Sequence, residues 1–248
     1  MQALEGKVAL VTGASRGIGA AIARQMIGEG ASLVGLSKSG ASEDDLAASD
    51  AYVAMAGDVT APGVAPRAVG TAVERFGQLD VLVNNAGVDL AKPFRETTAK
   101  DARRILEVHV IGAMLMMQAA LPELHKRDGA IVNVTSRLAT IGVPEMSVYG
   151  AAKGGLLSLS RGAAVELAAD GIRVNAVAPG MTETDLLHEW LADQPDPDAA
   201  RRKVAAAIPQ GRLAAPENVA AAVVFLSSDR ARHITGINLP VDGGYTAT

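Results

Sequence analysis

The sequence contains no cysteine, few aromatic residues and no long apolar run. Without cysteine the chain forms no disulfide and offers no thiolate to zinc, so disulfide-stapled and Cys-ligated zinc proteins are excluded. The histidines His109, His125, His188 and His233 show no metal-ligand spacing. No stretch of 18 residues is continuously apolar, and the N-terminus lacks the basic segment and apolar core of a signal peptide. We therefore expect a cytoplasmic protein without a metal.

Positive charge is also scarce, because 27 Asp and Glu outnumber 23 Lys and Arg and leave a net charge of −4. Such a chain offers no broad cationic surface to nucleic acid or to a membrane. Apolar content is high, since 49% of the 248 residues are hydrophobic and 20% are charged. This composition excludes a disordered chain and supports one domain, residues 1–248, with small molecules as expected partners.

Short apolar runs alternate with longer stretches of helical spacing, as at Ile18, Ile22 and Met26. Strands that alternate with helices form a mostly parallel sheet with helices on both faces. The sequence therefore predicts an α/β, doubly wound Rossmann fold with a seven-stranded sheet. The expected strands are residues 8–12, 32–36, 51–56, 80–85, 130–135, 173–178 and 237–241.

Residues 181–212 interrupt this alternation. They contain Pro195, Pro197 and Pro209 among mixed charges, and they are too long for a simple connection. Segments of that size often cover binding sites, so we expect a substrate-loop insertion here.

A glycine-rich turn follows the first expected strand and leads into a helix. It reads Gly13-Ala14-Ser15-Arg16-Gly17-Ile18-Gly19. Missing Cβ atoms let the backbone approach a pyrophosphate, and the positive end of the helix favours its charge. The spacing differs from GxGxxG, and a tight turn without a ligand would use the same glycines, so the context along the chain has to decide.

The second expected strand ends near Ser37 and Lys38, where a fold that selects NAD places an acidic residue. Lys38 and Arg16 together would bind the 2′-phosphate of NADP, which an aspartate would repel. NADP(H) is therefore favoured and NAD(H) is the alternative, although two solvated cations would look the same. Asp58, after the third strand, is a candidate for an adenine contact or for a turn cap.

Tyr149 and Lys153 are four residues apart, so on a helix both lie on one face with Cβ atoms about 5–6 Å apart. A nearby ammonium favours the phenolate of a tyrosine, whose pKa is otherwise about 10. Ser136 follows the strand expected to end at 135, at the edge where open α/β sheets bind ligands. Its hydroxyl would hold a substrate oxygen while Tyr149 exchanges the proton and a nicotinamide carries the hydride.

The order and spacing of five motifs resemble the short-chain dehydrogenase/reductase family, from about Gly6 to Gly244. The motifs are the turn at 13–19, Asn84-Asn85-Ala86-Gly87, Ser136, Tyr149-x-x-x-Lys153 and Pro179-Gly180. Each motif alone is common, but their joint order in one domain is specific. The resemblance implies an NADP-dependent carbonyl reductase in which Lys153 also holds the nicotinamide ribose.

The resemblance implies further contacts, with the asparagine pair structural first and next to the cofactor second. Implied cofactor contacts are Val59, Asn85, Ala86, Gly87, Tyr149, Pro179, Gly180, Thr182 and Thr184. The residues implied to face the substrate are Leu138, Val143, Met146, Leu186, Leu187 and Trp190. They are mostly apolar, so we expect a hydrophobic ketone, aldehyde or secondary alcohol, although such residues also pack loops onto sheets.

The chain departs from the family at His109, three residues before Gly112, where related sequences usually carry an asparagine. In the family this position helps to hold a water that links the active-site lysine to solvent. Three interpretations stay open: His109 retains the proton relay, packs in the helix without a catalytic role, or marks an impaired enzyme.

Two other functions fit parts of the sequence. A 3-oxoacyl-[acyl-carrier-protein] reductase shares the turn, but only Arg127 is available for an acidic carrier, because Asp170 occupies the second basic position. A non-catalytic dinucleotide-binding sensor, or a scaffold protein, would not need Tyr149 and Lys153.

Related proteins are commonly homotetramers, and we expect one here. The resemblance places the C-terminal strand and the helix after Tyr149 at the interfaces. The helix residues concerned are Ala163, Ala164, Val165, Leu167 and Ala168. A helix buried within a monomer would have the same small apolar residues.

Overall fold

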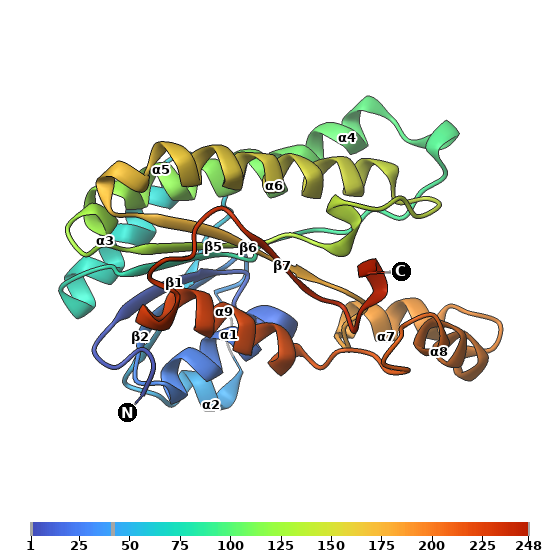
Figure 1. Cartoon of the computed structure of the whole chain (residues 1–248), viewed down its shortest axis with the longest axis horizontal. Coiled ribbons are helices and arrows are strands. Elements are labelled where there is room, and N and C mark those ends of the chain that lie inside the picture. The colour runs from blue at the N-terminus through green and yellow to red at the C-terminus, as the bar shows by residue number, and fades with distance from the viewer. Residues whose placement is uncertain (1, 41–42, 248) are drawn as a thin grey trace.

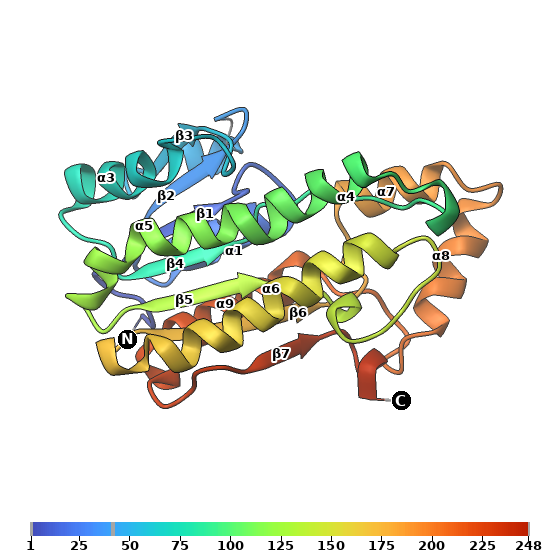
Figure 2. The same cartoon turned by 90° about the horizontal axis from the view of Figure 1, so that it is seen from above.

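The computed structural model describes residues 2–40 and 43–247. Its seven strands form one parallel sheet in the order β3-β2-β1-β4-β5-β6-β7 (Figures 1 and 2). The strands are β1 Val8–Thr12, β2 Ser32–Ser37, β3 Tyr52–Ala56, β4 Val81–Asn84, β5 Ala130–Val134, β6 Arg173–Pro179 and β7 Asn238–Val241. The predicted doubly wound Rossmann fold is confirmed, and the strand ends agree with the expected ones to within one residue.

Helices cover both faces of the sheet (Figure 1). One face carries α1 Gly17–Gly28 and α9 Pro216–Ser227, and the other carries α3 Val64–Phe76, α5 Ala113–His125 and α6 Ser147–Glu166. Side chains of each inner strand alternate between these layers, so Val11 joins the first core and Leu10 the second. Burial on both faces explains why the strands are almost continuously apolar.

One further helix lies on the same side as α5. The helix α4 Ala99–Leu106 continues through a π-helical segment, Glu107–Gly112, into α5. The resulting helix, Ala99–His125, is long and apolar enough to cross a membrane by length and composition. However, 44% of its most apolar window is buried inside the fold, and α5 packs against α3 and β4, as a core helix does.

Residues 181–212 contain α7 Asp185–Ala192 and α8 Pro197–Ala206 rather than an irregular loop. The two helices share a small apolar cluster, and they extend beyond the carboxyl end of β6 (Figures 1 and 2). A bridge between Thr182 and Ala214 joins the two ends of this segment. The expected insertion is therefore a two-helix unit anchored next to the sheet; the short helix α2, Asp44–Ala47, completes the α-helices of the described residues.

The strand order reverses between β1 and β4, because the chain moves from β1 to β3 in one direction and returns to β4 on the other side of β1. In open α/β sheets, ligands bind at the carboxyl ends of the strands at such a reversal. The glycine-rich turn follows β1, and the Asn84–Gly87 motif begins at the end of β4. Both motifs thus meet at the expected ligand-binding edge.

Candidate active site

The glycine-rich turn has one very close backbone approach, at Gly19, and lies in contact distance of the segment after β6. A Cβ on Gly19 would lie 2.0 Å from the Gly13 carbonyl oxygen, so no other residue fits there without moving the backbone. Gly17 has φ +56°, and a Cβ on it would lie 3.5 Å from Thr184 Cγ2. The turn therefore faces the segment after β6. The cofactor contacts predicted from the sequence in that segment are Pro179, Gly180, Thr182 and Thr184.

The first turn of α1 suits an anion. Its N-cap residue, Arg16, makes no side-chain capping bond, and the first turn contains no acidic residue. The backbone N–H groups at the start of a helix have no intrahelical partner and attract phosphate. The described residues at 13–19 therefore fit the pyrophosphate of a dinucleotide.

Asn85 holds the turn in place. Its Nδ2 donates to the carbonyl oxygens of Thr12 at 3.1 Å and Gly13 at 3.2 Å. In return, Thr12 Oγ1 accepts the N–H of Asn85 and of Ala86, each at 3.0 Å. Asn84 instead donates to Asn133 Oδ1 at 2.9 Å and ties β4 to β5. The pair is structural in this geometry, and Asn85 fixes the shape of the phosphate turn.

Two cations lie at the same edge of the sheet, since β1 and β2 pair in register up to Thr12 and Leu36. Lys38 pairs with Asp58 at 2.7 Å, and this contact lowers the pKa of the Asp58 carboxyl. Arg16 lies 3.9 Å from Glu189 of α7. Both cationic side chains are about two-thirds exposed (65% and 67%), so these are weak surface pairs that a phosphate can replace.

Ser136, Tyr149 and Lys153 come together at the carboxyl end of β5. Ser136 precedes a short 3₁₀ turn, where its Oγ accepts the Leu138 N–H at 3.1 Å, and its side chain acts to lower the pKa of the Tyr149 phenol. Tyr149 and Lys153 lie on α6, with Lys153 Nζ 5.7 Å from the centre of the Tyr149 ring. The predicted arrangement of these three side chains is thus present in the structure.

Burial opposes the charged form of both ionisable groups. It lowers the pKa of Lys153 to about 7, and the Nζ donates to the Val134 carbonyl oxygen at 2.8 Å. The pKa of Tyr149 is raised by burial and by the negative charge of Asp89, against the opposing hydrogen bond from Ser136. The sequence predicts a phenol pKa that is lowered by Lys153 and a nicotinamide cation together. In the structure the ammonium binds Val134 instead of the phenol oxygen, so this lowering requires a further positive charge in the site.

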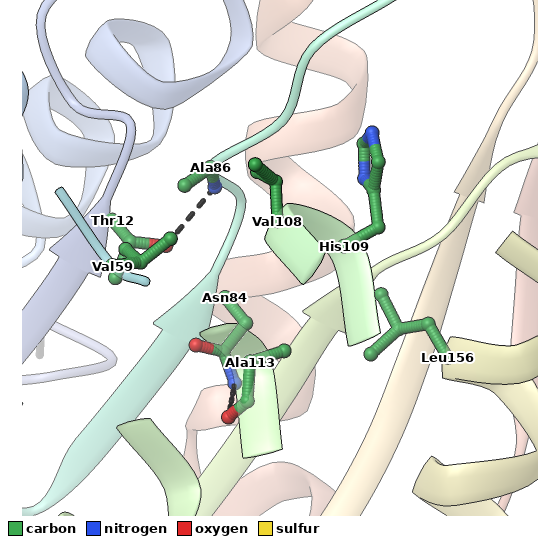
Figure 3. A pocket seen from close by; sticks show the side chains of 8 residues that line it. All are labelled: Thr12, Val59, Asn84, Ala86, Val108, His109, Ala113 and Leu156. Carbon is green, nitrogen blue, oxygen red and sulfur yellow. Dashed lines mark hydrogen bonds between the residues drawn. The ribbon is translucent and has the colours of Figure 1, made fainter. Parts of the chain in front are cut away.

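His109 lies in the π-helical segment, where its ring is buried. Nε2 is 2.8 Å from the Val88 carbonyl oxygen, and the ring meets the Tyr149 ring edge-on with centroids 5.4 Å apart. Nε2 also lies 3.3 Å from the Val88 amide nitrogen, so whether it donates or accepts depends on the tautomer. His109 also lines a cavity of about 10 Å³ together with Asn84 and Thr12, and Figure 3 shows its ring pointing away from these two side chains.

Burial and the Lys153 charge lower the pKa of His109 from 6.5 to about 3. As the pH falls, the imidazole of the unfolded chain therefore becomes protonated at a higher pH than that of the folded chain. The contribution of the neutral ring to the free energy of unfolding is complete above pH 6.5 and is lost between pH 6.5 and 3. At pH 4.5 we expect the wild type to have lost more stability than His109→Asn, relative to neutral pH, by on the order of 3 kcal/mol. Urea unfolding of both proteins at pH 7 and 4.5 measures this difference.

The exposed His233 supplies the matched control for this prediction. His233→Asn should keep the pH dependence of the wild type within about 0.5 kcal/mol. Equal losses in wild type and His109→Asn would contradict a neutral, buried imidazole.

The predicted substrate-facing residues divide into three groups. Leu186 and Trp190 are exposed on α7, four residues apart on one face. Leu187 instead packs into the apolar cluster between α7 and α8. Leu138 is buried, while Val143 and Met146 are half-buried in the connection to α6. Part of this set therefore builds the two-helix unit, because a helix must bury one face.

Three contacts near Tyr149 were not expected from the sequence. The carbonyl oxygens of Val88 and Val134 hold His109 and Lys153, and backbone acceptors leave no mark in a sequence. Asp89 is an exposed carboxylate whose charge acts on Tyr149. Its position two residues after Gly87, at the ligand-binding edge, was a signal that could have identified it.

Comparisons with known proteins identify the family. A family model described as enoyl-(acyl carrier protein) reductase matches residues 13–246. The chain is 44% identical over 252 residues, 99% of each chain, to cis-4-hydroxycyclohexanecarboxylate dehydrogenase of Sinomonas cyclohexanicum. It is 38% identical to meso-2,3-butanediol dehydrogenase of Serratia marcescens, over 98% of this chain and 96% of the relative.

A third relative is named for a different substrate. The 3-oxoacyl-[acyl-carrier-protein] reductase of Vibrio cholerae is 38% identical over 97% of this chain and 98% of the relative. The three relatives are therefore named as dehydrogenases or a reductase with different substrates. With its parallel sheet, glycine-rich turn and Ser-Tyr-Lys arrangement, the chain belongs to the short-chain dehydrogenase/reductase family of nicotinamide-dependent oxidoreductases.

Proposed function

We propose that this protein is an NADP(H)-dependent oxidoreductase that interconverts an alcohol and a ketone or aldehyde, with Tyr149 as the acid and base. The observation that carries the proposal is the arrangement of Ser136, Tyr149 and Lys153 at the carboxyl end of β5, with Lys153 Nζ 5.7 Å from the centre of the Tyr149 ring. A single domain, residues 1–248, supplies both cofactor and substrate sites. The two-helix unit at 181–212 covers the substrate side.

Each side chain has one task in the reaction. In the oxidative direction Ser136 holds the alcohol oxygen and Tyr149 accepts its proton, and a bound oxidised nicotinamide would accept the hydride from the same carbon. The products are a carbonyl compound, the reduced cofactor and one proton. When bound, the oxidised nicotinamide supplies the hydride acceptor and a positive charge that favours the phenolate. When protonated, Lys153 adds a second positive charge that favours the phenolate, and it also holds the nicotinamide ribose.

Cofactor preference rests on the residues at the end of the second strand. No acidic side chain ends β2, and Lys38 and Arg16 lie at neighbouring strand ends. A 2′-phosphate carries two negative charges and competes well for surface cations that otherwise pair weakly. We therefore assign NADP(H) as the preferred cofactor, with NAD(H) as the alternative.

His109 acts as a positioning residue in this proposal. Its Nε2 is occupied by the Val88 carbonyl, and its low pKa keeps the ring neutral at physiological pH. A neutral ring in contact with Tyr149 fixes the phenol without adding charge. We therefore expect activity to persist despite the departure from the family's asparagine.

The test is turnover of a panel of secondary alcohols with NADP⁺, followed by the absorbance of the reduced nicotinamide. We expect the wild type to oxidise some of these alcohols. The double variant Ser136→Ala, Tyr149→Phe should show no oxidation above background. A protein that binds NADPH but oxidises or reduces no member of a broad panel would support the sensor alternative instead.

The carrier-protein alternative has weaker support. The exposed Asp170 lies beside His125, with a 4.0 Å contact to its Nδ1, at the position where a basic residue would bind the carrier. A carboxylate there repels an acidic partner, and Arg127 alone does not offset it. A free alcohol or ketone is therefore favoured over an acyl chain on a carrier.

We expect a homotetramer in which part of α6 is an interface. Val165 is 83% exposed on this helix. Ala164 is buried in the core of the protomer, so we do not expect it to contribute to the interface. A charge at position 165 would be desolvated on assembly, so Val165→Glu should at least halve the mass in solution. Light scattering measures this mass; a monomeric wild type, or an unchanged mass in Val165→Glu, would contradict the prediction. Val165→Ala is the control that should stay assembled.

A further inference from the structure

Arg137, the residue after Ser136, carries a positive charge that no acidic side chain neutralises. Among the residues that the structure describes, no aspartate or glutamate forms an ion pair with its guanidinium. Its Nη1 atom is buried and has no hydrogen-bond partner within this part of the chain. A buried donor without an acceptor is destabilising and calls for an explanation, which a ligand can supply.

A contact with Tyr245 fixes where this guanidinium lies. Arg137 Cζ is 4.1 Å from the centre of the Tyr245 ring. Arg137 follows β5 and Tyr245 follows β7, and β6 lies between these two strands in the sheet. Because neighbouring strands are about 4.8 Å apart, the two side chains meet across a gap of about 10 Å between strand ends. They therefore meet over the carboxyl end of β6, at the ligand-binding edge of the sheet.

The Tyr245 ring in turn packs against the apolar cluster that α7 and α8 share. Figures 1 and 2 show the C-terminal turn that carries Tyr245, in red, beside the connection from β5 to α6 and beside the two-helix unit. Arg137 thus lies between two walls of the site, because Ser136 directly precedes it and the two-helix unit lies behind Tyr245. A substrate held by Ser136 under the two-helix unit comes within reach of the guanidinium.

The chemistry of this group selects an anion. An aromatic ring stabilises the positive charge of a guanidinium but satisfies few of its five N–H donors. A carboxylate matches the planar fork with two oxygens and neutralises its charge, whereas an ammonium is repelled. A phosphate dianion carries a second negative charge that one guanidinium leaves unpaired. A single carboxylate is therefore the group that fits Arg137.

We propose that Arg137 is a substrate-binding residue that holds a carboxylate of the substrate, so that the protein interconverts a hydroxy acid and a keto acid. The proposal rests on the proposed function and refines its substrate class. Leu138 is buried next to Arg137 in the chain, and Val143 and Met146 are half-buried in the same connection to α6. These neighbours are apolar, so the chain between the reacting carbon and the carboxylate is expected to be apolar too.

The test is the reduction of keto acids of increasing length by NADPH, each compared with its methyl ester. The acids are 4-oxopentanoate, 5-oxohexanoate and 6-oxoheptanoate, which place the carboxylate two, three and four methylene groups from the reacting carbon. A hydrogen bond to a charged group contributes about 10- to 100-fold, so for at least one length kcat/KM of the acid should exceed that of its ester by about tenfold or more.

Two variants of Arg137 separate binding from a structural role. Arg137→Met should bring the ratio of acid to ester to about one, with the loss mainly in KM of the acid, because a carboxylate bound away from the reacting carbon is held equally in the ground and transition states. Arg137→Lys should keep part of the preference, since an ammonium retains the charge and loses the fork. A merely structural role would change acid and ester alike.

Inhibition gives a second measurement that needs no turnover of an acid. Hexanoate, which has no ketone, should compete with the methyl ester of 5-oxohexanoate, and Arg137→Met should weaken this inhibition by about tenfold or more. Arg127→Met is the matched control, because Arg127 is exposed and precedes β5, at the end of the strand away from Ser136. It should change neither the ratio of acid to ester nor the inhibition.

The outcomes are distinct. A wild type that reduces each ester as well as its acid, or an Arg137→Met variant that keeps the wild-type ratio, overturns the proposal. If no keto acid is reduced while secondary alcohols are oxidised in a Tyr149-dependent way, the carboxylate assignment is wrong and the proposed function stands. If neither keto acids nor alcohols react, the proposed function fails and the assignment of Arg137 fails with it.

Discussion

Tyr149→Phe should lower kcat for alcohol oxidation by about 1,000-fold, because the variant keeps the ring and loses only the group that exchanges the proton. General acid and base groups typically contribute about 100- to 10,000-fold. The edge-on contact with His109 involves the ring and is retained. NADPH should therefore raise the thermal midpoint of the variant nearly as much as that of the wild type.

Tyr52 supplies the matched control. Its hydroxyl is buried and has no hydrogen-bond partner among the described residues, and it lies on β3 away from α6. Loss of an unpaired buried hydroxyl costs little, so Tyr52→Phe should keep full activity and stability. A Tyr149→Phe variant with more than about a tenth of wild-type activity would remove Tyr149 from the acid and base role.

The double variant Arg16→Ala, Lys38→Ala should lose about 100-fold in affinity for NADPH while its affinity for NADH changes less than about threefold. Each cation makes a charge-assisted bond to the 2′-phosphate, which NADH lacks. Loss of the surface pairs with Glu189 and Asp58 should leave the stability within about 1 kcal/mol of the wild type. Titration of both nucleotides by calorimetry measures the two affinities.

Lys126→Ala controls for the general loss of positive charge. Lys126 is an exposed cation paired with Glu123 at the end of α5, and α5 leads into β5 at the opposite edge of the sheet. We expect no change in either affinity. An equal loss of NADPH and NADH binding in the double variant would mean that both cations act on the shared pyrophosphate instead.

The fold was predictable because its signals are local and repeated. Each buried strand is an apolar run of a few residues, and spacings such as Ile18, Ile22 and Met26 identify the helices between them. The spacing of Tyr149 and Lys153 placed both on one helix face, and the position of Ser136 after β5 brought it to the same edge. Topology alone then assembles these three side chains.

The rest depends on tertiary contacts that a sequence does not record. The π-helical segment that turns His109 toward Val88 is set by packing, and Gly112 fits closely against Val59 within it. Lys153 binds a backbone oxygen, so its distance from the phenol could not be read from the four-residue spacing. The helices at 181–212 form because Leu187 and its partners bury one face together.

The most direct test of the cofactor site and of the function built on it is the thermal midpoint with saturating NADPH and, separately, with NADH. A ligand present at about 100 times its dissociation constant stabilises the fold by about 2.7 kcal/mol, or about 5–10 °C for a chain of this length. We predict this shift for NADPH and a smaller one for NADH. A larger shift with NADH would contradict the roles of Arg16 and Lys38, and no shift with either nucleotide would contradict the proposed function.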